Sequence, residues 1–287
     1  YEILIGLVGS EMCIRDRRLF EHGTPGSQNL KLTRKYYTED MPDGRVKHIV
    51  QNITDPDIVP YIPDVIGNST DRQRIPAVLI IPGGAFRRLV YNFEGEDVAK
   101  WLNSMGIAAF VLECRLPSDE HDNAEDVPLI DAMRAMRVIR GRAQEFGIDE
   151  AKIGVMGFSA GGFMAALLST AYESDVYADY KYKDEYDKLS ARPDFAVCSY
   201  PVISIDDCIE AGKRYMSEEQ VLERISDSKA KILHKYNPDK LVRPDMPPVF
   251  ICETDDDRTT LSENSVGFYM AARKAGVSAE LHIFLSL

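Results

Sequence analysis

The residues best suited to chemistry lie at positions 157–161, which read Gly-Phe-Ser-Ala-Gly. Glycines at this spacing favour a sharp turn between a strand and a helix, because a side chain at either flanking position would obstruct it. The turn leaves the Oγ atom of Ser159 exposed, where it can attack a carbonyl carbon. An apolar strand-like run at 153–156 leads into the pattern, and a helix-like run at 163–168 follows it. We therefore expect Ser159 to be a nucleophile rather than part of a turn that only packs.

A glycine-rich loop at 82–86, Pro-Gly-Gly-Ala-Phe, directly follows the first strongly apolar run of the chain. Acyl transfer to a serine creates a tetrahedral oxyanion, which an enzyme stabilises with backbone N–H groups aimed at the charged oxygen. Pro-Gly-Gly turns are common in proteins, but this one precedes Ser159 by about 75 residues. We expect the N–H groups of Gly84, Ala85 and Ala160 to form the oxyanion hole, the last because it follows the nucleophile.

An acidic stretch, Glu-Thr-Asp-Asp-Asp at 253–257, follows a strand-like apolar run. A serine nucleophile on such an elbow is followed along the chain by the acid that orients its catalytic histidine. Only one aspartate can do this, so a solvated acidic turn explains the other two. The residues alone leave Asp255, Asp256 and Asp257 as alternatives.

Short apolar runs recur along the chain, as expected for strands that are buried on both faces of a parallel sheet. They lie at 77–82, 107–113, 152–156, 195–199, 249–252 and 280–284. The spacing of apolar residues between these runs predicts helices at 94–105, 129–146 and 263–275. This alternation predicts a mostly parallel sheet with helices on both faces.

Two segments interrupt the alternation. Residues 172–192 are rich in Tyr, Lys and Asp, and we interpret them as a polar surface excursion. Residues 203–245 contain a capping-box pattern that begins at Ser217, followed by apolar residues at helical spacing. We expect a small helical insertion over the carboxyl edge of the sheet, where ligands bind in open α/β folds.

Composition narrows the classes of partner. The 34 basic and 46 acidic residues give a net charge of −12, which disfavours nucleic-acid phosphates and anionic membrane surfaces. No apolar run approaches the ~18 residues of a membrane helix. The five cysteines are scattered, with no Cys-x-x-Cys pair and no histidine at zinc-ligand spacing. We expect neither a metal site nor a disulfide framework.

From about Thr24 to Phe284 the chain resembles the esterase/lipase group of α/β-hydrolases, and within it an acetylxylan-esterase-like bacterial branch. The loop at 82–86 matches that branch's Pro-Gly-Gly-Gly-Tyr loop, 154–162 its elbow, and 247–250 its late strand. The resemblance implies an α/β-hydrolase fold with a small helical insertion and a serine carboxylester hydrolase that needs no cofactor. Its implied substrate is a small-molecule or carbohydrate ester, from which it would remove a small acyl group such as acetyl.

The resemblance also selects the acid. Similar proteins read His-Gly-x-x-Asp-x-x-Val before a helix that begins Glu-Asn-Ser, and residues 263–265 of this chain read Glu-Asn-Ser. Counting back from them places Asp257 in the catalytic position, with Asp256 as the runner-up. The chain departs from the pattern at Glu253 and Thr254, which stand where His and Gly are usual.

The catalytic histidine of similar proteins lies in a Gly-Gly-His-like turn a few residues after the last strand, so we expect the base to lie beyond the end of this chain. The five histidines present are His22, His48, His121, His234 and His282. The first three precede the elbow, and His234 lies in the expected insertion. We keep His282 as the alternative base, although its place in an alternating strand favours a structural role.

Both ends of the chain look foreign to the fold. Residues 1–17 resemble a translated sequencing adapter, and 285–287 resemble the matching adapter at the other end. We expect residues 18–287 to form a single, C-terminally truncated α/β-hydrolase domain. Two other functions stay open: a peptidase of the same fold, which usually carries an extra domain, and a non-catalytic binding module. An intact Ser159, acid loop and glycine-rich loop argue against the module.

Overall fold

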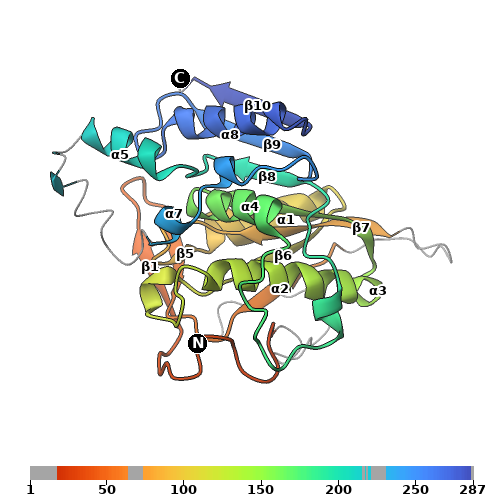
Figure 1. The fold of residues 1–287 in the computed structure, drawn as a ribbon. Coiled ribbons are helices and arrows are strands. Elements are labelled where there is room, and N and C mark those ends of the chain that lie inside the picture. The colour runs from red at the N-terminus through yellow and green to blue at the C-terminus, as the bar shows by residue number, and fades with distance from the viewer. Residues whose placement is uncertain (1–17, 64–73, 215–216, 218, 221–230, 286–287) are drawn as a thin grey trace.

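The computed structural model describes residues 18–63, 74–214, 217, 219–220 and 231–285. Within these residues the core element is a seven-stranded sheet with the order β10-β9-β8-β7-β4-β6-β3 (Figure 1). Every neighbouring pair is parallel except β3 and β6 at one edge. The strands are β3 (Asp57–Tyr61), β4 (Ile75–Ile81), β6 (Ala108–Glu113), β7 (Ile148–Phe158), β8 (Ala196–Ser199), β9 (Val249–Thr254) and β10 (Ala279–Phe284).

The six strands expected from apolar runs are all present, within a few residues of the expected bounds at most ends. All six residues of β6 and the last five of β4 are buried, because helices cover both faces of the sheet. The main helices are α1 (Asp97–Ser104), α2 (Val127–Gly141), α3 (Ala143–Phe146), α4 (Ala160–Ala171) and α8 (Ser262–Lys274). The fold is the mostly parallel, doubly covered α/β sheet that the alternation predicts.

The direction of the crossovers decides which face each helix covers. From β4 the chain crosses through α1 to β6, toward one edge, whereas from β7 it crosses through α4 to β8, toward the other. Right-handed crossovers in opposite directions place their helices on opposite faces. Figure 1 shows α2 and α4 on the near face and α1 on the far face. The adjacent carboxyl ends of β4 and β7 therefore form a topological switch point, where open α/β sheets bind ligands.

Several elements were missed from the sequence. A three-stranded sheet of β1 (Lys35–Asp40), β2 (Val46–Gln51) and β5 (Leu89–Val90) lies outside the main sheet. Strand β3, at the edge of the main sheet, was also not expected. Strand β1 pairs antiparallel with β2, and antiparallel sheets can face water. Its residues are almost all exposed, so its sequence lacks the apolar run of a buried strand. The expected helix at 129–146 is interrupted at Arg142, and the one at 94–105 begins with a π-helical turn, η2 (Asn92–Glu96).

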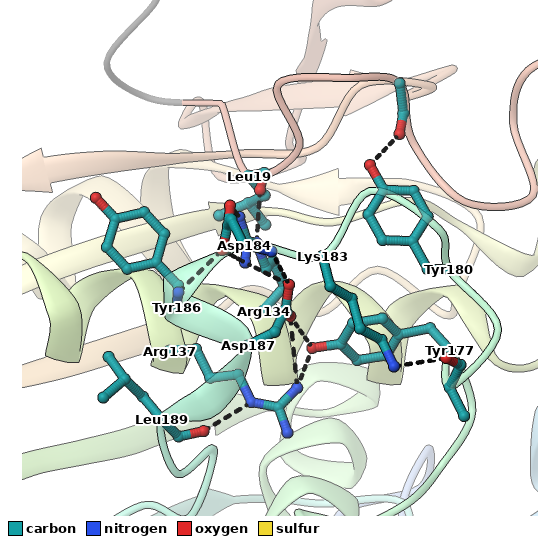
Figure 2. Close-up of polar contacts among 12 residues, drawn as sticks. Leu19, Arg134, Arg137, Tyr177, Tyr180, Lys183, Asp184, Tyr186, Asp187 and Leu189 are labelled. Atoms are coloured by element: carbon teal, nitrogen blue, oxygen red, sulfur yellow. Dashed lines mark hydrogen bonds and ion pairs between the residues drawn. The ribbon is translucent and has the colours of Figure 1, made fainter.

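The excursion at 172–192 is bound firmly to α2 (Figure 2). Arg134 donates to the carboxylate of Asp184 over 2.7 Å and forms an ion pair with Asp187 at 3.1 Å. Tyr177 is buried, and its hydroxyl donates to the same Asp187 carboxylate over 2.8 Å. Arg137 donates to the carbonyl of Leu189 over 3.0 Å. The segment is therefore polar, as expected, and its carboxylates Asp184 and Asp187 hold it against the helix through Arg134.

The insertion at 203–245 contains α5 (Ile205–Lys213), α7 (Lys231–Lys235) and the short turn η6 (Pro238–Lys240). The expected capping box is present: Ser217 Oγ accepts from the N–H of Gln220 over 3.3 Å, and Gln220 Oε1 accepts from the N–H of Ser217 over 3.0 Å. α5 begins six residues after β8 ends, which places it at the carboxyl edge of the sheet. The remainder of the expected helix, at 221–230, lies outside the described residues, as does the segment 1–17.

Candidate functional site

Ser159 stands at the turn between β7 and α4, with backbone angles φ 52° and ψ −117°. Such a conformation costs a non-glycine residue roughly 1–3 kcal/mol and persists only where the surroundings impose it. A Cβ atom at Gly157 would lie 2.0 Å from the carbonyl oxygen of Gly161, and one at Gly161 would lie 2.0 Å from that of Ile81. Only glycine fits at both positions, so the local sequence accounts for the sharp turn at the serine.

The glycine-rich loop lies against this turn. A Cβ atom at Gly83 would come within 3.1 Å of the Cβ of Ser159 and within 2.4 Å of the carbonyl oxygen of Phe158. The next three residues all have positive φ angles: Gly84 at 138°, Ala85 at 56° and Phe86 at 59°. The loop backbone therefore lies beside Ser159 at the switch point, where backbone N–H donors to an oxyanion are needed.

The backbone N–H of Gly83 is not available to the oxyanion hole, because it donates to Glu94 Oε2 over 2.7 Å. Ala160 is the first residue of α4, and the first N–H groups of a helix have no acceptor within the helix. The positive end of the helix dipole adds to their attraction for an anion. The N–H groups of Gly84, Ala85 and Ala160 stay the expected donors.

The acid loop follows β9 and distinguishes among the three aspartates. Asp257 is half-buried, whereas Asp255 and Asp256 are exposed. Asp257 Oδ1 accepts from the N–H groups of Thr259 at 2.6 Å and Thr260 at 2.9 Å, and Oδ2 accepts from the Thr260 hydroxyl at 3.1 Å. A carboxylate held by three donors has a fixed orientation, as the orienting member of a triad needs.

None of the five histidines, all of which lie in the described part of the chain, is hydrogen-bonded to Ser159 or Asp257 there. His121 is buried, with Nδ1 at 3.0 Å from Ser27 Oγ, and burial, helped by Arg115, lowers its pKa to about 4. His282 lies on the edge strand β10 between the rings of Phe250 and Phe284, with Nε2 at 2.5 Å from Glu280. These contacts favour the structural reading of His282.

The last strand leads toward the acid loop. Phe284 is paired with Thr254, and its carbonyl oxygen accepts a hydrogen bond from the N–H of Asp255 over 2.9 Å. Asp255 is two residues from Asp257 in sequence. The end of β10 therefore lies beside the acid loop.

A buried carboxyl group, Glu253, was not singled out as functional from the sequence. It is 2% exposed at the end of β9, where its oxygens accept from the N–H of Thr254 at 3.0 Å and the hydroxyl of Ser265 at 3.3 Å. Burial, with a smaller contribution from Asp257, raises its pKa from 4.5 to about 7. The available signal was an acidic residue at the end of a buried strand.

The raised pKa of Glu253 predicts a pH-dependent stability. Between pH 4.5 and about pH 7 the unfolded chain has lost this proton while the folded protein keeps it, so the free energy of unfolding falls as the pH rises. Glu253→Gln should remove that dependence and stabilise the protein above pH 7 by up to ~3 kcal/mol, at 1.36 kcal/mol per pKa unit.

Urea unfolding at about pH 5 and about pH 8 measures this effect. The exposed Glu210→Gln variant is the control and should follow the wild-type curve. Parallel pH curves for wild type and Glu253→Gln would show that the buried carboxyl does not control stability.

Glu94 was noted in the sequence only as the start of a helix. In the structure its two oxygens contact opposite flanks of the elbow: Oε2 accepts from the N–H of Gly83 and Oε1 accepts from the hydroxyl of Tyr200 over 3.1 Å. Burial raises the pKa of Glu94, and burial followed by the Glu94 charge raises that of Tyr200. The two residues are 106 positions apart, so no local pattern could have joined them.

Within the residues the structure describes, no group of three or more His, Cys, Asp or Glu side chains is arranged to hold a metal ion. Among the same residues, no helix has the length and apolar character to cross a membrane.

Two curated relatives are similar to most of the chain. An acetylxylan esterase from Xylanibacter ruminicola is 31% identical over 212 residues, which are 73% of this chain and 40% of the relative. An endo-1,4-beta-xylanase B from Butyrivibrio fibrisolvens is 29% identical over 257 residues, 87% of this chain and 39% of the relative. The chain thus spans about two fifths of the length of these curated relatives.

Solved structures share the fold. An acetyl ester-xyloside bifunctional hydrolase from Caldicellulosiruptor lactoaceticus is 37% identical, with a TM-score of 0.65 over 82% of this chain and 79% of that one. A thermophilic esterase from Thermogutta terrifontis is 24% identical, with a TM-score of 0.60 over 92% and 84% of the two chains, and shows the fold alone. The model of the BD-FAE family matches residues 64–271. The chain therefore belongs to the BD-FAE family and has the α/β-hydrolase fold.

Proposed function

We propose that this protein is a serine carboxylester hydrolase that removes small acyl groups such as acetyl from carbohydrate esters. One observation carries the proposal: the strained elbow of Ser159 lies against a glycine-rich loop at the switch point of the sheet. The similarity to an acetylxylan esterase and to an acetyl ester-xyloside hydrolase supports acetyl as the acyl group and a carbohydrate as the alcohol of the substrate.

The reaction proceeds by acyl transfer in two steps. Ser159 Oγ attacks the ester carbonyl carbon and gives its proton to a histidine base. The resulting oxyanion accepts hydrogen bonds from the N–H groups of Gly84, Ala85 and Ala160. When the intermediate collapses, the alcohol leaves with the proton from the imidazolium, and the acyl group stays on the serine. Water then repeats these steps and releases the acid, while Asp257 holds the imidazole in the required tautomer.

The base in this mechanism is a histidine other than the five at the described positions. This is supported by the contacts that engage His121 and His282 elsewhere, and by the position of Phe284, at the end of β10, beside the acid loop. We call this sequence, continued after Phe284 by a segment with a Gly-Gly-His turn as similar proteins have, the extended chain.

The proposal predicts that the 287-residue chain hydrolyses 4-nitrophenyl acetate only slowly and that the extended chain is a competent esterase. Without an imidazole at about 2.6–3.2 Å, the serine hydroxyl is a weak nucleophile. The oxyanion donors alone still give ~10³–10⁴-fold over water, so a faint rate is expected. Release of acetate from acetylated xylan by the extended chain tests the carbohydrate substrate.

His282→Ala is the matched variant for this experiment. We expect it to leave the rate of either chain within about threefold of its parent, because the ring stacks on Phe250 and Phe284 and contacts Glu280, all on strands β9 and β10. Fast turnover by the 287-residue chain that His282→Ala removes would instead identify His282 as the base.

A further inference from the structure

Glu94 connects the two segments that flank the nucleophile. Gly83 follows β4 and Tyr200 follows β8, and these strands lie on either side of β7 in the sheet. The Glu94 carboxylate accepts from the Gly83 N–H at 2.7 Å and from the Tyr200 hydroxyl at 3.1 Å. A single side chain therefore spans the end of the strand that carries Ser159.

The segment that presents Glu94 is itself held firmly. Glu94 lies in the π-helical turn η2, and such turns are frequent at functional sites. The turn begins at Asn92, whose side chain accepts from the N–H of His48 at 2.9 Å and donates to the carbonyl of Val46 at 2.8 Å. Gly95 is buried so closely that a Cβ atom there would lie 3.0 Å from Val111. The carboxylate thus extends from a rigid support, which precise positioning requires.

The backbone on both sides of this carboxylate is in conformations that are unfavourable without support. Ala85 and Phe86 have φ angles of 56° and 59°, and Tyr200 has a φ angle of 37°. Residues stay in such strained conformations only when surrounding contacts hold them. For the loop, the contacts at its start are those of Gly83: its N–H donates to Glu94, and its carbonyl oxygen accepts from the N–H of Val90 at 2.9 Å.

We propose that Glu94 is a positioning residue that braces the oxyanion loop against Tyr200 and so fixes the direction of the Gly84 and Ala85 N–H groups. By taking the N–H of Gly83, Glu94 sets the plane of the peptide that precedes these donors. The inference rests on the proposed function, since the donors matter only if an oxyanion forms at Ser159. It assigns to Glu94 no contact with the substrate.

Three variants of the extended chain test the brace. Glu94→Ala removes both hydrogen bonds and should lower kcat for 4-nitrophenyl acetate by ~10–100-fold with KM within about twofold, because misdirected donors weaken binding of the transition state alone. Glu94→Gln should keep kcat within about threefold of wild type, since its amide oxygen can accept from Gly83 and its NH₂ can donate to Tyr200. Tyr200→Phe removes one contact and should give an intermediate loss.

Glu96→Gln is the matched control, since Glu96 lies in the same turn and forms an ion pair with Lys100 at 2.6 Å. It should match wild type in both constants. The brace is overturned if Glu94→Ala retains the wild-type kcat. It is also overturned if Glu94→Gln loses as much as Glu94→Ala, because the amide can keep both hydrogen bonds and an equal loss would show that kcat does not depend on them.

A second readout does not depend on catalysis. In the ¹⁵N-labelled 287-residue chain, the Gly83 amide proton should resonate downfield and exchange slowly, and Glu94→Ala should reverse both and shift the amides of Gly84 and Ala85. Unchanged amides would overturn the brace even if the enzyme is active. If the extended wild type hydrolyses no ester while these amide changes occur, the proposed function fails and the positioning by Glu94 stands.

Discussion

Replacing Ser159 by alanine should lower kcat of the extended chain for 4-nitrophenyl acetate by about 10⁶-fold, the loss found when a serine hydrolase loses its nucleophile. Alanine retains the Cβ atom, so the turn between β7 and α4 keeps its packing while the attacking oxygen is gone. The oxyanion donors are backbone N–H groups and survive the substitution. They should leave a residual rate of ~10³–10⁴-fold over water.

The control for this loss is Ser174→Ala, because Ser174 lies beyond the end of α4. It should be indistinguishable from wild type in initial-rate assays. A Ser159→Ala enzyme that retained more than about a tenth of wild-type kcat would show that the acyl group is transferred to water without this serine.

Asp257→Asn should lower kcat of the extended chain by about 10⁴-fold, as loss of the orienting carboxylate does in serine proteases. An amide cannot stabilise the imidazolium, and it favours the wrong tautomer of the neutral ring. The amide oxygen can still accept from the N–H groups of Thr259 and Thr260, and the NH₂ group can donate to the Thr260 hydroxyl, so the loop should keep its conformation. The loss should appear in kcat and kcat/KM together.

The neighbouring aspartates provide matched controls. Asp255→Asn and Asp256→Asn change exposed groups in the same loop and should stay within about threefold of wild type. A large loss at Asp256 with Asp257→Asn near wild type would mean that the acid stands one residue earlier than the register indicates.

Features governed by local physics could be predicted from the sequence. The central strands are continuous apolar runs because both of their faces are buried, and β6 is the clearest case. The elbow was predictable because the close backbone contacts that require glycine are at Gly157 and Gly161, each two residues from Ser159. The capping box at Ser217 is likewise a short-range pattern.

Features that depend on long-range contacts could not be predicted. The exposed strand β1 has no apolar run to mark it. The positive φ angles of Ala85 and Phe86 could not be predicted, because alanine and phenylalanine rarely adopt positive φ. The contact of Glu94 with Tyr200 depends on the order of the strands, which brings β8 and β4 to the two sides of β7. The identity of the base stays a prediction.

The most direct test of the account is to find where an organophosphorus ester attaches. The extended chain is treated with the ester, digested and mapped by mass spectrometry, beside its Ser159→Ala variant. An activated serine forms a stable covalent adduct with such a reagent, whereas ordinary hydroxyl groups do not. The account predicts a single adduct on Ser159 that is absent from the variant. An adduct on any other residue, or labelling that persists in Ser159→Ala, would contradict it.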